Sequence, residues 1–150
     1  MNRETLTREE IWYAVTSCKG ISREEIDRIL AVIGDPAALF GTSRDAAVDM
    51  LTQQSALFSG RAAITPERAR LLQNQCDEKK IHEEMEGLER NGVRFLCQDT
   101  ADYPERFKIL KDPPFGLYVK GSLPAENEMT CRTVKKSWKM PMQLWLFPYT

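Results

Sequence analysis

The sequence predicts an α+β fold, in which a small helical bundle precedes the first strands of a sheet. Three observations support this prediction. Helix start and stop signals recur through residues 1–91, the spacing of apolar residues changes at Gly92, and prolines enclose a short apolar segment from Phe115 to Val119. At 150 residues, the chain has the length of one average domain, or of one small domain and part of another.

Two capping boxes predict the first two helices. Thr7 lies three residues before Glu10, and Ser22 lies three residues before Glu25. In each pair the hydroxyl can accept an N–H of the first helical turn, while the glutamate reaches back to the N–H of the capping residue. Apolar residues follow at helical spacing, and we expect the first helix to end near Gly20.

Two proline dipeptides predict later helix starts. Asp35-Pro36 and Thr65-Pro66 each place a capping side chain before a proline at the first helical position, where the missing N–H costs nothing. The helix after Pro36 is expected to be short. The helix after Pro66 is expected to run unbroken to about Arg90, where an Asn-Gly stop signal follows.

After the helical region, the pattern indicates strands. Val93 to Cys97 is a short apolar run, and a helical turn or two from Glu105 to Leu110 leads to a second strand, Phe115 to Val119. Two strands alone do not make a stable sheet. Because prolines interrupt the end of the chain, we expect residues after Pro124 to supply no further strand, and residues 92–150 to add little cooperative stability.

A set of residues around the second predicted strand forms a specific pattern. These residues restrict the backbone or build the strand: Tyr103, Pro104, Asp112, Pro113, Pro114, Leu117, Tyr118 and Gly121. They resemble the YP…DPP…LYxxG signature of the DNA-processing protein A family (DprA, also called Smf). In that family the signature has a structural role and enters an extended Rossmann-like domain of the SLOG type. A strand with a glycine turn follows there, whereas residues 129–134 of this chain read MTCRTV with no glycine turn after them. The resemblance therefore covers the helical region loosely and residues 92–124 well, and then breaks.

The resemblance implies three parts of the chain. Residues 1–91 correspond to the helical amino-terminal domain, which is similar to sterile-alpha-motif or helix-hairpin-helix domains. Residues 92–130 correspond to the start of the Rossmann-like domain, which this chain leaves incomplete. Residues 131–150 form a tail outside the family pattern.

This tail carries four basic and no acidic side chains, and two of the three tryptophans of the chain. One explanation is a basic and aromatic tail that packs on the body or contacts a partner. The other explanation, which the sequence favours, is that the tail sequence does not correspond to the family sequence that normally follows this point. A frameshift, a sequencing error and a regulated short form are all open as its origin.

The family role implied by the resemblance is to bind incoming single-stranded DNA and to load RecA recombinase onto it during natural transformation, without enzymatic activity. Single-stranded DNA and RecA are therefore the expected partners, and full-length family members form homodimers. The strand-binding pocket and the dimer surface belong to the portion beyond the divergence. No nucleic-acid-binding residue can therefore be carried over, and we expect both activities to be impaired in this chain.

Composition and motifs narrow the other function classes. The formal net charge of −1 gives no global attraction to nucleic acid or to an anionic membrane. Cys18, Cys76, Cys97 and Cys131 form no CxxC pair, which predicts reduced thiols and no metal site. No signal peptide, spanning segment, catalytic motif or cofactor motif is visible, so we expect a cytoplasmic protein without catalytic residues, cofactor or membrane contact. The single histidine, His82, is expected on a solvated helix face.

Two alternative functions stay open. One is a stand-alone helical module that binds a protein partner. The other is a nucleotide phosphoribohydrolase-like enzyme, which the sequence disfavours because the glycine-rich PGGxGT loop of that group is absent. Cations and aromatics also alternate between residues 94 and 120, a mixture suited to single-stranded nucleic acid, although core and ordinary surface positions explain it better.

Overall fold

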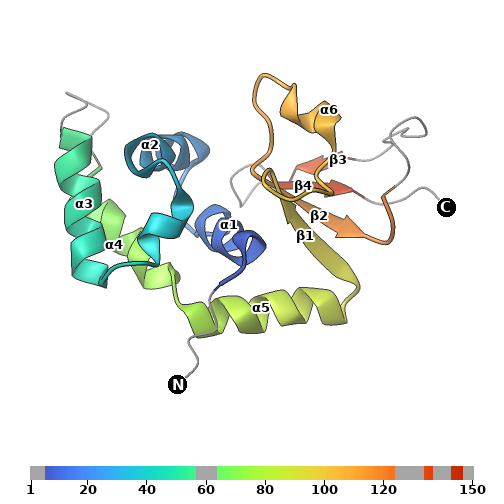
Figure 1. Ribbon diagram of the computed structural model, residues 1–150, viewed down its shortest axis with the longest axis horizontal. Coiled ribbons are helices and arrows are strands. Elements are labelled where there is room, and N and C mark those ends of the chain that lie inside the picture. The colour runs from blue at the N-terminus through green and yellow to red at the C-terminus, as the bar shows by residue number, and fades with distance from the viewer. Residues whose placement is uncertain (1–5, 57–63, 124–133, 137–142, 147–150) are drawn as a thin grey trace.

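The computed structural model describes residues 6–56, 64–123, 134–136 and 143–146, and it shows a mixed α+β fold. The elements in chain order are α1 (Arg8–Thr16), α2 (Arg23–Ile33), η1 (Pro36–Leu39), α3 (Arg44–Ala56), α4 (Pro66–Gln75), α5 (Glu78–Arg90), β1 (Val93–Cys97), α6 (Glu105–Lys108), β2 (Gly116–Lys120), β3 (Val134–Lys136) and β4 (Gln143–Leu146). Figure 1 shows α1 in the middle of the molecule, with α2, α3 and α4 on one side of it and the strands on the other. The sequence-based α+β prediction is confirmed at this level.

The helix starts follow the predicted caps. Both capping boxes form, with the Thr7 and Ser22 hydroxyls accepting the N–H groups of Glu10 and Glu25. The carboxylate of Asp35 caps the short helix η1 by accepting the N–H of Ala37 at 2.8 Å. The end of α1 differs from the prediction, because this helix stops at Thr16 rather than near Gly20.

The long helix predicted from Pro66 to about Arg90 is instead two helices, α4 and α5. Cys76 leaves the helical conformation, and Asp77 caps α5 by accepting the N–H of Lys80 at 2.9 Å. An aspartate that bonds the backbone ahead of it stabilises a helix start and competes with continuation of the preceding helix. The break redirects the chain, so that α5 packs against β1 and α1.

The sheet has the strand order β1-β2-β4-β3. Strands β1 and β2 are antiparallel, with Val93 opposite Lys120 and Cys97 opposite Gly116, and β4 runs parallel to β2. The expectation that residues after Pro124 supply no strand is therefore wrong. The reason is that the prolines lie outside β3 and β4, and the apolar and aromatic residues of β4 favour a strand.

One apolar core crosses from the helices to the sheet. Trp12 of α1 stacks on Phe115 with ring centroids 5.9 Å apart, while Tyr13 meets Phe95 and Tyr118 edge-on at 5.5 and 6.4 Å. Successive strand residues point to opposite faces. A second, smaller cluster therefore lies on the other face of the sheet, beneath α6, and contains Leu96, Tyr103, Phe107, Leu117 and Val119.

Candidate functional site

The tyrosine and the prolines of the signature meet in one buried contact. Tyr103 is 2% exposed, and its hydroxyl donates a hydrogen bond of 2.7 Å to the carbonyl oxygen of Pro114. Its ring lies edge-on to Phe107 of α6. Burial raises the pKa of Tyr103 to about 12, so this hydroxyl remains a hydrogen-bond donor throughout the neutral range.

The same proline segment is held by the helical region. Arg23, the first residue of α2, donates from Nη2 to the carbonyl oxygen of Pro113 at 3.0 Å. Its guanidinium carbon lies 4.0 Å from the centroid of the Phe115 ring, which Trp12 of α1 also contacts. A cation over an aromatic face is attractive, more so when water is partly excluded. Pro113 of the signature and the neighbouring Phe115 therefore join α2 and α1 to the sheet.

The remaining signature residues lie at separate places. Leu117 and Tyr118 are buried in β2 on opposite faces of the sheet. Gly121 follows the strand with a φ of +89°, a conformation that glycine adopts without strain. Asp112 is exposed and Pro104 is buried ahead of α6.

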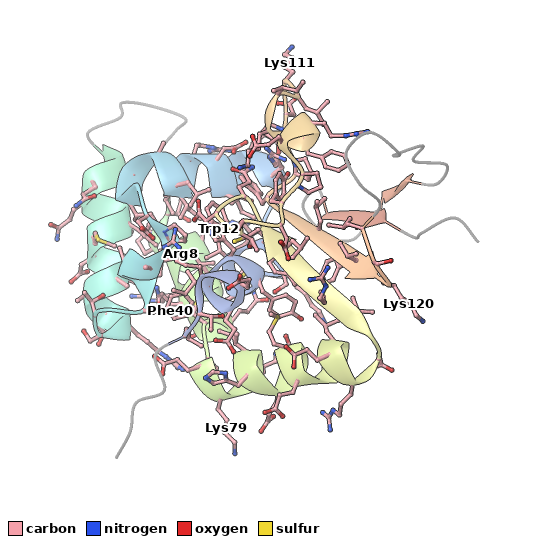
Figure 2. All side chains as sticks on the ribbon, turned by 45° about the vertical axis from the view of Figure 1, so that its right-hand side comes forward. Arg8, Trp12, Phe40, Lys79, Lys111 and Lys120 are labelled. Atoms are coloured by element: carbon pink, nitrogen blue, oxygen red, sulfur yellow. The ribbon has the colours of Figure 1, made fainter. Side chains whose placement is uncertain are left out.

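Two of the five cations between residues 94 and 120 form ion pairs, and two others lie apart from each other (Figure 2). Arg94 pairs with Asp102 at 3.4 Å, and Lys108 pairs with Glu105 at 2.7 Å. Figure 2 shows Lys111 and Lys120 pointing away from the body at separate places. The interleaved aromatics Phe95, Tyr103, Phe107, Phe115 and Tyr118 are all buried in the two apolar clusters.

A cleft of about 460 Å³ runs between α5, the start of α1 and strand β1, and we name it the α5–β1 cleft. It has an apolar floor and a rim rich in carboxylates. Its lining consists of Thr7, Glu9, Glu10, His82, Met85, Glu86, Leu88, Glu89, Val93, Arg94, Phe95, Leu96, Thr100 and Asp102. With His82 neutral, these side chains carry a formal net charge of −4.

The sequence predicted that His82 lies on a solvated helix face, and this prediction is wrong because His82 lines the cleft. Nδ1 of His82 lies 2.5 Å from Oε1 of Glu10, and the two side chains are 30% and 10% exposed. The other oxygen of Glu10 accepts the N–H of Thr7 at 2.7 Å in the capping box. The Nε2 atom of His82 is buried and has no hydrogen-bond partner among the described residues.

This geometry determines what the pair can do. A carboxylate that holds Nδ1–H leaves Nε2 as a free acceptor when the imidazole is neutral, and as a donor when it is charged. The pair therefore leaves a buried polar atom without a described partner on a residue that lines the cleft. The prediction missed it because Glu10 and His82 are distant in sequence. No spacing or motif in the sequence linked the two residues.

In the part of the chain that the structure describes, no three His, Cys, Asp or Glu side chains come together in a way that could hold a metal ion. Within the same residues, no helix combines the length and the apolar character needed to cross a membrane.

Comparison with protein-family models, with curated proteins and with solved structures finds no match.

Proposed function

We propose that the chain is the amino-terminal part of a DprA-like DNA-processing protein. The proposed role is that of the family, which is to bind single-stranded DNA in the cytoplasm and to load RecA recombinase onto it. The proposal assigns no catalytic step. Its support is the resemblance of the signature residues, together with their arrangement in space.

The observation that carries the proposal is the contact of Tyr103 with Pro114, flanked by the bond from Arg23 to Pro113. A signature with a structural role should build a junction between its two domains, and these residues join the helices to the sheet. The antiparallel pairing of β1 with β2 is also compatible with the edge of a Rossmann-like sheet. Doubly wound sheets often carry such an antiparallel edge strand.

The proposal is tested first on the gene. The DNA beyond codon 130 should encode, in another reading frame, a strand followed by a glycine turn of the VGxR type. If all three frames lack such a segment, the proposed family membership is contradicted.

DNA binding gives a second test. Because the cations of residues 94–120 are dispersed or paired, the 150-residue chain should bind labelled oligo-dT weakly or not at all at low salt. Extension by the family's next strands should produce salt-sensitive binding and faster loading of RecA. Submicromolar binding by the unextended chain would instead mean that residues 94–120 contain a strand-binding site.

A second candidate function is a module that binds a protein partner. The α5–β1 cleft favours it, because the cleft combines an apolar floor, a charged rim and a buried polar atom without a partner among the described residues. This combination is typical of binding sites.

A further inference from the structure

Strand β1 is an edge strand of the sheet in the part of the chain that the structure describes. In an antiparallel pair, alternate residues direct their N–H and C=O groups toward the neighbouring strand. Cys97 donates its N–H to the hydroxyl of Thr100 at 3.0 Å, and so turns this group away from β2. By the same alternation, the main-chain groups of Phe95 and Val93 also face away from β2. An edge with such groups is a template for another strand.

The α5–β1 cleft lies along this edge. Four consecutive residues of β1, Val93 to Leu96, line the cleft, and so does Thr100, which accepts the N–H of Cys97. Consecutive strand residues point to opposite faces of a sheet, so they border one cavity together only where the cavity runs along the strand edge. The volume of about 460 Å³ is within the range of about 300–1,000 Å³ that ligand sites occupy.

The charge of the cleft selects its occupant. Glu86 and Glu89 of α5 are exposed at the rim and form no ion pair among the described residues. Arg94, the one arginine among the described lining residues, is paired with Asp102. The cleft therefore repels anionic segments and attracts cationic ones. Its floor, with Met85 and Leu88, accepts apolar side chains.

We propose that the α5–β1 cleft binds an extended segment of a partner protein in which basic and apolar side chains alternate, and that this segment adds to the sheet as a strand beside β1. The main chain of the segment bonds Val93 and Phe95, and its basic side chains meet Glu86 and Glu89. Strand addition of this kind takes affinity from the main chain and specificity from alternate side chains. The inference rests on the second candidate function and not on membership of the DprA family.

The test uses the full chain and a labelled peptide of sequence KVKVKV, with KKKVVV as a probe of equal charge and composition. Fluorescence anisotropy should show binding of the alternating peptide and weaker binding of KKKVVV. Replacing Glu86 and Glu89 together by glutamine should weaken binding about fivefold, the size expected for two exposed ion pairs. The matched control is Glu24→Gln with Glu83→Gln, which removes the same charge from exposed positions outside the cleft and should change binding less than about twofold.

Strand addition has a signature that charge attraction alone lacks. Two sets of alternate peptide amides can be N-methylated. Methylation of the set that faces β1 should abolish binding, whereas methylation of the other set should leave binding nearly unchanged. Amide hydrogen exchange of Val93 and Phe95 should slow in the complex, whereas the amides of Arg94 and Leu96 should change little. Equal effects of methylating the two sets, equal binding of the two peptides, or no binding at all would overturn the proposal. None of these results would affect the DNA and gene tests of the DprA proposal.

Discussion

The hydroxyl of Tyr103 and the side-chain amide of Gln98 share one acceptor, the carbonyl oxygen of Pro114, at 2.7 and 3.2 Å. This shared acceptor fixes the proline segment before β2 against the loop after β1. The same segment carries the bond from Arg23, so the carbonyl groups of two successive prolines anchor three parts of the chain.

Removal of the tyrosine hydroxyl should destabilise the protein modestly. Tyr103→Phe should lower the free energy of unfolding by about 1 kcal/mol, because Gln98 still satisfies the buried carbonyl. The double variant Tyr103→Phe/Gln98→Ala should cost more than the sum of the single variants, since it leaves the carbonyl without either donor. Urea unfolding of the four proteins measures this. Strict additivity would mean that the two donors act independently.

A methyl group at Gly116 should have a larger effect. A Cβ at this position would lie 2.2 Å from the ring of Phe95, which covers the glycine across the β1–β2 pair. Gly116→Ala should therefore destabilise the protein by about 1–3 kcal/mol, as overpacking of a core does. Gly41→Ala is the control, because a Cβ at Gly41 would meet no atom within 4 Å, and its cost should be below about 0.5 kcal/mol. Similar denaturation midpoints for the two variants would contradict the close packing at Gly116.

The ion pair between α2 and α4 should make stability depend on acid pH. Arg68 donates to both carboxylate oxygens of Glu25 at 2.6 Å and holds the pKa of Glu25 below its usual value. A lowered pKa in the folded state gives stability that is present above the unfolded pKa, near 4.5, and that is lost as the pH falls below it.

The variant Glu25→Gln isolates this contribution, since glutamine preserves the capping box with Ser22. Both side chains are partly exposed, at 24% and 39%, so the pair should contribute only about 0.2–1 kcal/mol at neutral pH. The difference in stability between the two proteins should shrink between about pH 5 and 3, as followed by thermal unfolding. A difference that grows on acidification would show the opposite sign and refute the assignment.

The shared core changes the expected response to protease. The sequence predicts little cooperative stability for residues 92–150, whereas Trp12 and Tyr13 of the helical region pack on Phe95, Phe115 and Tyr118. We now expect limited proteolysis to leave no resistant fragment that ends near residue 91. Amides of α2 and β2 should also exchange with similar opening free energies, as in one cooperative unit. A stable fragment of residues 1–91 would show that the helices fold without the sheet.

The sequence by itself determined the features that depend on neighbouring residues. The hydroxyls of Thr7 and Ser22 mark helix starts, and the first two strands lie where the apolar runs predicted them. These signals act over about four residues, so they can be recognised in the sequence without knowledge of the tertiary structure. The break at Asp77 is also local. The sequence did not predict it because helix-forming residues continue on both sides of this capping aspartate.

Only the tertiary structure decided which distant groups meet. Glu10 contacts His82 because the chain changes direction at Asp77 and α5 lies beside α1. Gly116 lies beneath Phe95 because β1 pairs with β2 in one register. The α5–β1 cleft exists for the same reason. Such contacts depend on how helices and strands bury their apolar faces against one another, and no spacing within a single element encodes that arrangement.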